Sequence, residues 1–273
     1  MSVKFLDPHR IVDVMRNCAN DIVMPYFRNL SDTQIWRKKN NSIVTIADIK
    51  SEEFLQRNLL NLLPGSTTIG EEETENDPRI VNRLRGDKPV WVIDPVDGTS
   101  NYAQGKKRFS MIIALCINGE AIGGWLATPA TDRYFWSMKD EGSWSGEKRI
   151  FITGNKIYRS QKLSGSLGAK ITKLEGIRNN FKNLYRQACC GADYMDIAEE
   201  KLDFAFYRGG MKVWDHCAGD LLVREAGGHT GELVTGKAYR PINPPYNGIL
   251  ASCSKKVFNS VSEILKNSLE KEH

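Results

Sequence analysis

Long hydrophobic runs are absent from this sequence. No stretch of its 273 residues approaches the roughly 18 consecutive apolar residues that a membrane-spanning helix needs. The N-terminal residues MSVKFLDPHR also lack the successive charged, apolar and small-residue regions of a signal peptide. We therefore expect a cytoplasmic protein without a membrane partner.

Paired cysteines and a strong charge of one sign are also absent. None of the six cysteines belongs to a C-x-x-C pair, so we expect reduced, mostly buried thiols and neither a disulfide framework nor a zinc site. Lys and Arg number 38 against 33 for Asp and Glu, a net charge of +5, without the clustering of a nucleic-acid binder. This balance argues against nucleic acid as a partner and favours a small phosphorylated metabolite.

The overall composition is that of a globular protein. Hydrophobic residues make up 41% and charged residues 26%, which excludes a disordered or fibrous chain. Apolar periodicity and turn residues predict an α+β fold. The predicted elements are, in order, helices 9–30 and 48–63, strands 67–69 and 90–93, an antiparallel meander 110–138 that turns at Asn118-Gly119, helix 192–201, strand 204–207, helix 218–226, strand 249–252 and a final helix that includes 257–265.

Two aspartates stand where the predicted strand 90–93 breaks into a turn. Asp94 and Asp97 flank Pro95 and Val96, and the fixed φ of Pro95 limits how the turn can relax. Both carboxylates and the Val96 carbonyl can then converge and supply hard oxygen ligands, which suit magnesium. Taken alone, Asp-Pro-Val-Asp-Gly favours a plain turn over a site.

The context of this turn favours a site. Glu71 also follows a short apolar strand, and Asp215 stands just before the predicted helix 218–226, so three loops each offer an acid. A helix that starts near Gly98 would add free amides for a phosphate group. Hydrolysis of a phosphate monoester, a dianion that repels hydroxide, needs such cations to neutralise charge and activate water.

Segments 70–72, 94–102 and 214–228, together with 43–48 upstream, resemble the inositol monophosphatase family of magnesium-dependent, lithium-sensitive phosphomonoesterases. The resemblance implies a layered αβαβα sandwich of the sugar-phosphatase type, a homodimer, and two or three Mg²⁺ ions. Since we find no repeat or long linker, we expect residues 1–273 to form a single catalytic unit. Any division into lobes would fall near 1–150 and 151–273, with one shared active site.

The resemblance also implies roles for individual residues. The first magnesium would be held by Glu71, Asp94 and the Val96 carbonyl, the second by Asp94, Asp97 and Asp215, and a weaker third would also use Glu71. Thr99 would position and deprotonate the attacking water, Asp48 would hold Thr99 in place, and Glu72 would lie behind the metal ligands. The implied catalytic residues are Thr99, Glu71 and Asp48, and the implied substrate contacts are Gly98, Thr99, Ser100, Asp215 and Arg208.

The substrate is less closely defined by the same comparison. Inositol-specific members carry a Glu seven residues before the second-motif Asp, where this chain has Arg208, and Cys189-Cys190-Gly191 replaces a Gly-x-Ala segment. Inositol 1-phosphate is the default substrate. Histidinol phosphate, fructose 1,6-bisphosphate and a 3′-phosphonucleotide remain alternatives, and Arg208 would meet a carboxylate, a second phosphate or a neighbouring acid.

Two further interpretations concern charge and partners. The run Arg37-Lys38-Lys39 is more typical of a solvated loop than of a contact, and no histidine is expected as a metal ligand, because magnesium prefers oxygen. A regulatory RNA- or transcription-associated protein of the same fold is the alternative from another class. A degenerate binding protein would be expected to lose a metal acid, and this chain keeps them all.

Overall fold

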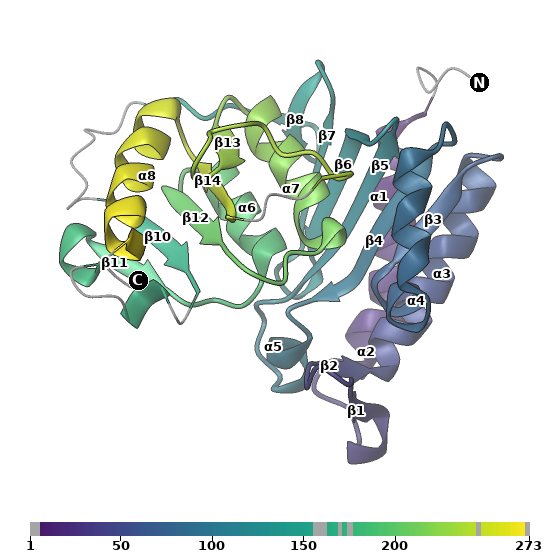
Figure 1. Cartoon of the computed structure of the whole chain (residues 1–273). Coiled ribbons are helices and arrows are strands. Elements are labelled where there is room, and N and C mark those ends of the chain that lie inside the picture. The colour runs from purple at the N-terminus through teal and green to yellow at the C-terminus, as the bar shows by residue number, and fades with distance from the viewer. Residues whose placement is uncertain (1–5, 155–162, 169–170, 174–176, 244–246, 271–273) are drawn as a thin grey trace.

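The computed structural model describes residues 6–154, 163–168, 171–173, 177–243 and 247–270. Five layers follow one another across the molecule: helices, a seven-stranded sheet, helices, a five-stranded sheet and a last helix (Figure 1). This arrangement is the αβαβα sandwich that the resemblance implies, and it confirms the α+β class. No helix among the described residues has the length and apolar character needed to cross a membrane.

The larger sheet carries the acidic turn. Its strands lie in chain order, and only the β3–β4 pair is parallel, whereas every later neighbour is antiparallel. The strands are β3 (Thr67–Gly70), β4 (Val90–Asp97), β5 (Ser110–Ile117), β6 (Glu120–Thr128), β7 (Arg133–Met138), β8 (Gly142–Ser145) and β9 (Lys148–Ile150).

The smaller sheet lies beyond the middle helices and has the order β11-β10-β12-β14-β13. Strand β10 is parallel to both of its neighbours, and the remaining pairs are antiparallel. The strands are β10 (Ser164–Leu167), β11 (Asn183–Tyr185), β12 (Phe204–Tyr207), β13 (His229–Glu232) and β14 (Ile249–Ser252).

Helices fill the spaces around the two sheets (Figure 1). The outer layer against the larger sheet contains α1 (Pro8–Cys18) and α3 (Ile46–Leu62), the middle layer contains α6 (Cys190–Ala198) and α7 (Val213–Glu225), and α8 (Lys255–Glu270) covers the smaller sheet. Short helices α2 (Met24–Tyr26), α4 (Glu71–Asn76) and α5 (Thr99–Ala103) and the hairpin β1 (Ile35–Arg37) and β2 (Ile43–Thr45) complete the described elements near the acidic turn.

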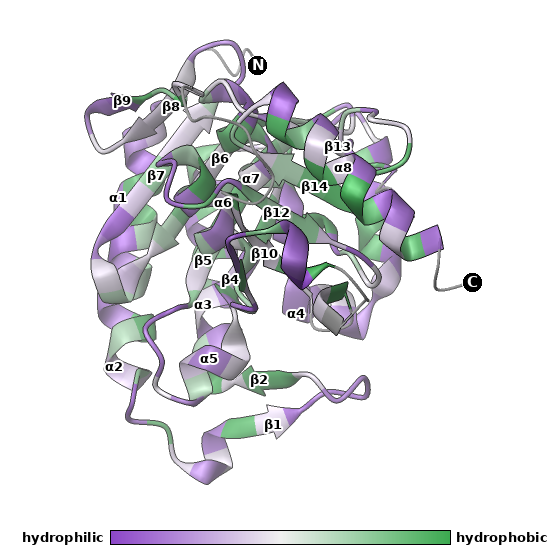
Figure 2. Cartoon of the chain, turned by 90° about the vertical axis from the view of Figure 1, so that its left-hand side faces the viewer, coloured by the Kyte–Doolittle hydropathy of each residue, from purple (hydrophilic) through white to green (hydrophobic). Residues whose placement is uncertain are grey.

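Alternation along the strands divides the core in two. On β4, Trp91 and Ile93 join the cluster under α1 and α3, whereas Val90 and Val92 face the middle helices. Side chains of successive strand residues point to opposite faces, so a strand buried on both sides reads as a continuous apolar run. The apolar segments accordingly gather inside the molecule, while the β1–β2 hairpin stands out from its body (Figure 2).

The sequence predictions need two adjustments, and one prediction is confirmed in detail. The first helix ends at Tyr26 instead of 30, after a π-helical stretch (Ala19–Val23) that precedes Pro25, which cannot donate a backbone hydrogen bond. Helix α7 begins at Val213, so Asp215 lies in its first turn and not before it. The hairpin prediction is confirmed, because Asn118 and Gly119 have φ of 51° and 70°, as a type I′ turn requires.

Candidate active site

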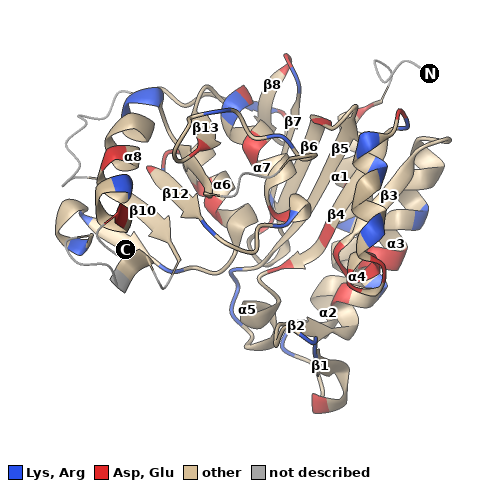
Figure 3. Cartoon of the chain, in the orientation of Figure 1, with Lys and Arg blue, Asp and Glu red and all other residues tan. Residues whose placement is uncertain are grey.

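The predicted acids meet at the junction of α4, β4 and α7. One cavity of about 540 Å³ is lined by residues of all three of these elements and of the start of α5. In Figure 3 acidic residues mark α4 and the lower end of β4, which face this junction. Its lining includes Glu71, Asp94, Val96, Asp97, Gly98, Thr99, Ser100 and Asp215.

A β-bulge explains how Asp94 and Asp97 reach the same cavity. Asp94 pairs with Ile112 and Asp97 with Ser110, so β4 has one more residue than β5 between the two pairs. In a regular strand, residues three apart point to opposite faces, and the extra residue brings both carboxylates onto one face. The Pro95 turn predicted from the sequence is therefore a bulge inside β4.

Asp94 is a deeply buried acid with one carboxylate oxygen left unpaired. It is only 1% exposed, and its Oδ1 has no hydrogen-bond partner among the described residues. Burial raises the pKa of Asp94 well above its ordinary value of 3.8, and the nearby carboxylates of Glu71 and Asp97 raise it further. A buried, unpaired carboxylate oxygen among like charges is the group that a cation would stabilise.

Asp97 is fixed from one side by three donors. Its Oδ2 accepts from the Ser110 hydroxyl at 2.7 Å, the Gly191 amide at 2.8 Å and the Cys189 thiol at 3.1 Å. These contacts hold the carboxylate plane. A Cβ at Gly191 would lie 2.2 Å from the Ser110 hydroxyl oxygen, so this position requires glycine for space.

Thr99 and Asp48 form the contact that the resemblance implies. The Thr99 hydroxyl lies 3.0 Å from Asp48 Oδ1 and 2.9 Å from the Val96 carbonyl oxygen, and it can donate to either. Asp48 Oδ2 in turn accepts from the amide and hydroxyl of Thr45, at 2.8 and 2.5 Å, which closes a capping box at the start of α3. Burial raises the pKa of Asp48 to about 7.

Lys38 occupies a position that the sequence interpretation missed. Its ammonium donates to Glu71 Oε1 at 2.7 Å and to Glu72 Oε1 at 2.8 Å, and its side chain is only 5% exposed. The expectation of a solvated loop at Arg37-Lys38-Lys39 is therefore wrong for Lys38. The cause is the β1–β2 hairpin, which folds Lys38 back over α4. A run of three basic residues does not reveal where the chain will fold back.

Glu52 is a second missed residue. Its carboxylate accepts from the amides of Glu72 at 2.8 Å and Glu73 at 2.7 Å, which are free donors in the first turn of α4. Glu52 thereby fixes the helix that begins with Glu71. The sequence did contain a signal for this role. The helical spacing of the predicted helix 48–63 places Glu52 on its buried inner face, where a carboxylate needs hydrogen-bond donors.

Asp215 approaches the cluster from α7. Burial raises its pKa well above 3.8, and the carboxylates of Asp97 and Glu71 raise it further. The Cys190 thiol donates to the Asp215 carbonyl at 3.1 Å, so the Cys189-Cys190 pair contacts both halves of the acid cluster. The Nδ1 of His216 pairs with the Tyr194 hydroxyl at 3.0 Å, and burial lowers the pKa of His216 to about 3, which keeps the ring neutral.

The acid cluster suits magnesium in its donor chemistry. Among the described residues, no three His, Cys, Asp or Glu side chains already stand close enough to hold a metal ion, and Glu71 is paired with Lys38. The orphaned Asp94 oxygen and the mutually repelling carboxylates nevertheless supply the hard oxygens that magnesium prefers. The residues fit the ion, provided that Glu71 exchanges Lys38 for it.

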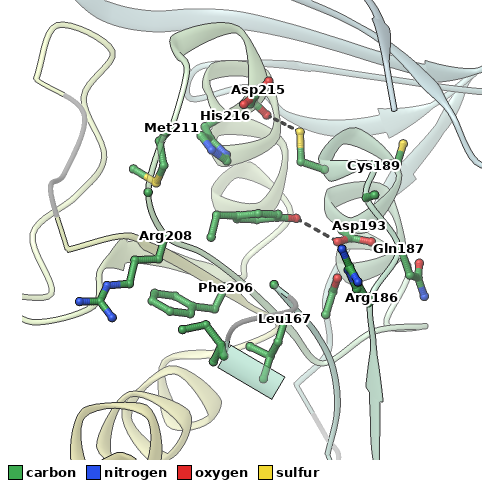
Figure 4. A pocket seen from close by; sticks show the side chains of 18 of the residues that line it. Leu167, Arg186, Gln187, Cys189, Asp193, Phe206, Arg208, Met211, Asp215 and His216 are labelled. Carbon is green, nitrogen blue, oxygen red and sulfur yellow. Dashed lines mark hydrogen bonds between the residues drawn. The ribbon is translucent and has the colours of Figure 1, made fainter. Parts of the chain in front are cut away.

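A larger cavity of about 780 Å³, here called the leaving-group cavity, adjoins the cluster and shares Asp97 and Asp215 with it (Figure 4). Arg208 borders this cavity, but it is exposed and its guanidinium points away from Asp215 and His216 (Figure 4). Asp193, which the sequence interpretation did not select, lines the cavity and accepts from Tyr207 at 3.2 Å and from Arg108 at 2.5 Å.

Comparison with known proteins identifies the family and supports the fold. The model of the inositol monophosphatase family matches residues 11–266. The Nus factor SuhB of Pasteurella multocida (strain Pm70) is 27% identical over 93% of this chain and 95% of its own length. The inositol monophosphatase of Dictyostelium discoideum is 30% identical over 83% and 84%. The solved structure of a Thermotoga maritima IMPase superimposes with a TM-score of 0.81 at 21% identity, covering 95% of this chain and 96% of that one.

Proposed function

The chain belongs to the inositol monophosphatase family, and from that premise we propose that it hydrolyses a small phosphate monoester with Mg²⁺, with inositol 1-phosphate as the default substrate. The family is one of metal-dependent phosphatases. The observation that supports the proposal most is the convergence of four carboxylates on one cavity, with a buried Asp94 oxygen left unpaired.

Glu71, Asp94, Asp97, Asp215 and the Val96 carbonyl would hold two or three magnesium ions. When bound, magnesium supplies charge neutralisation at the phosphoryl oxygens, activation of a water and stabilisation of the departing alkoxide. A rigid carboxylate such as Asp97, fixed by three donors, presents its free oxygen without reorganisation.

Thr99 and Asp48 would orient the attacking water. When Asp48 is ionised, it accepts a hydrogen bond from the Thr99 hydroxyl. The lone pairs of the Thr99 oxygen then remain available to accept a hydrogen bond from water. The amides of Gly98 and Ser100 lie at the start of α5, where backbone N–H groups are free to bind phosphoryl oxygens. Gly98 has φ of 81°, a left-handed conformation that favours glycine and turns the chain into α5.

The experiment is phosphate release measured with magnesium across a panel of inositol 1-phosphate, histidinol phosphate, fructose 1,6-bisphosphate and adenosine 3′,5′-bisphosphate. We expect turnover of at least one substrate, its loss in chelator, and inhibition by lithium, which can enter a magnesium position without supplying its charge. Full activity in chelator would contradict the metal mechanism. No turnover of any member would contradict the phosphatase proposal.

Two further expectations belong to this proposal. We propose that the protein is a homodimer and that it is cytoplasmic. Sedimentation of the purified protein tests its oligomeric state. A regulatory role with RNA or the transcription machinery, which the name of the Pasteurella relative suggests, is the alternative. Retention of Glu71, Asp94, Asp97, Asp215 and Thr99 in one cavity favours an enzyme over a protein that only binds.

A further inference from the structure

Arg186 connects the leaving-group cavity to a second hollow. It lines the leaving-group cavity together with Asp97 and Asp215, and it also lines a neighbouring cavity of about 490 Å³. Arg178 and Lys182 line that second cavity with it. A substrate held at the acid cluster can therefore extend through one cavity toward three cations.

The backbone presents two of these cations on one face. Lys182 and Arg186 lie directly before and after β11 (Asn183–Tyr185), at the even spacing that favours one face of an extended chain, and both line the second cavity together with Leu184. The Lys182 amide donates to the Leu163 carbonyl at 2.8 Å, and Tyr185 pairs in register with Ser166, a residue of the leaving-group cavity. This pairing fixes the end of β11 beside the cavity.

The three cations lack acidic partners, unlike other arginines near the cavity. Arg108 pairs with Asp193 and Asp196, and Arg133 pairs with Asp196 and Glu199. Across the described residues, Arg178, Lys182 and Arg186 form no ion pair, and only Arg178 has a side-chain hydrogen bond, to the Thr172 carbonyl. Neighbouring like charges without a counter-ion raise the free energy of the free protein, and a bound anion would lower it.

The leaving-group cavity also has an apolar part to its lining, made by Leu167, Ile171, Phe206 and Met211. Its volume falls in the range of roughly 300–1,000 Å³ that takes a ligand of drug size. A leaving group with a planar or apolar middle would pack against these side chains.

We propose that Arg178, Lys182 and Arg186, here named the distal basic cluster, bind a second anionic group of the substrate, remote from the phosphate that is hydrolysed. The substrate class is a phosphomonoester whose leaving group has an apolar or planar middle and a distal anion. This inference rests on the proposed phosphatase function. It also moves the anion site from Arg208, which the sequence indicated, to Arg186.

The test compares two substrates that differ by one phosphate, adenosine 2′-monophosphate and adenosine 2′,5′-bisphosphate, with products identified by chromatography. We expect the wild type to favour the bisphosphate in kcat/KM by about 10-fold or more, mainly through KM, as one charge-assisted hydrogen bond provides. The preference should shrink at high salt, because the cluster is exposed. Arg186→Gln should remove most of the preference.

Arg208→Gln is the matched control, since it removes an equal charge from the rim of the same cavity. We expect it to keep the bisphosphate preference. A preference lost in Arg208→Gln but kept in Arg186→Gln would return the anion site to Arg208 and overturn the proposal, as would a wild type without any preference. Equal changes for both substrates in Arg186→Gln would overturn it as well.

Calorimetric binding of the same two nucleotides separates this proposal from the phosphatase proposal. If neither nucleotide nor any substrate of the panel is hydrolysed, the proposed function fails. A tighter binding of the bisphosphate that Arg186→Gln abolishes would then still support the distal basic cluster, and equal binding of both nucleotides would reject it.

Discussion

At the scale of single residues, Asp94 offers the clearest test of the acid cluster. Its raised pKa means that the folded protein is penalised once pH rises above the ordinary value of 3.8, because the unfolded chain ionises more easily. We expect Asp94→Asn to abolish turnover and, in chelator at pH 8, to raise Tm by a few degrees, since about 1 kcal/mol moves Tm by roughly 2–4 °C in a chain of this size.

The pH dependence provides the control for Asp94→Asn. As pH falls toward 4, close to the ordinary value of 3.8, ionisation of this carboxyl favours the unfolded state less and less, so the difference in Tm between variant and wild type should become small. With saturating magnesium the order should reverse, because only the wild type binds the ion fully. A Tm difference that stays constant from pH 8 to pH 4 would show that the charge of Asp94 is not its cause.

Thr99 provides the second test at this scale. Thr99→Ala removes the hydroxyl that lies 3.0 Å from Asp48, and we expect kcat to fall by about 10² with little change in the magnesium dependence. Thr99→Ser keeps the hydroxyl and should recover most of kcat. Steady-state phosphate release at several magnesium concentrations measures both. An equal loss in the two variants would assign Thr99 to packing.

The same scale shows where sequence reasoning succeeds. Asp94, Asp97 and Thr99 were predicted because a short segment carries them, and local spacing determines how they converge. Lys38 was misassigned because its position depends on where a hairpin returns. Arg208 borders the leaving-group cavity as expected, but the direction of its side chain is set by neighbours distant in the chain. Contacts across long separations leave little trace in local spacing.

At the scale of elements, α4 depends on one glycine. A Cβ at Gly70 would lie 2.2 Å from the carboxyl carbon of Glu52, the group that holds the first amides of α4. We expect Gly70→Ala to push this carboxylate aside, destabilise the fold by about 1–3 kcal/mol and raise the magnesium concentration for half-maximal activity about 10-fold. Denaturant unfolding and a magnesium titration measure these effects.

Gly86→Ala is the matched control for Gly70→Ala, because its Cβ would meet only the Arg83 carbonyl at 3.4 Å. It should change neither stability nor magnesium dependence appreciably. Glu52→Gln removes the charge without the steric conflict and should reproduce the magnesium phenotype. If Glu52→Gln titrates like the wild type, then Glu52 supports the fold alone and does not position Glu71.

Element types were largely predictable and element ends were not. The β5–β6 hairpin follows from Asn118-Gly119, whose conformation is local. The bulge in β4 was interpreted as a turn, because Pro95 indicates a break but not whether pairing with β5 resumes beyond it. Likewise α7 begins at Val213 because packing between the two sheets extends it, which helix-start residues alone do not reveal.

At the scale of the whole molecule, the two halves of the chain share one of the two core clusters. The cluster around the middle helices contains Val92 and Ile112 from the first half and Phe204, Leu221 and Val261 from the second. The continuous apolar run Val90-Trp91-Val92-Ile93 is typical of a strand buried on both faces, but the sequence does not say which helices cover them. The acid cluster is equally divided, since Asp94 belongs to β4 and Asp215 to α7.

We therefore predict that the chain unfolds as one cooperative unit and that a fragment of residues 1–150 does not fold alone, because it would expose the face of the larger sheet that α6 and α7 cover. Calorimetry should give equal calorimetric and van't Hoff enthalpies. Because magnesium would have ligands from both halves, it should shift the single transition to higher temperature. At 100 times its Kd it should raise the free energy of unfolding by about 2.7 kcal/mol. Two transitions, of which magnesium moves one, would instead establish separate lobes near 1–150 and 151–273, with the metal held by one of them.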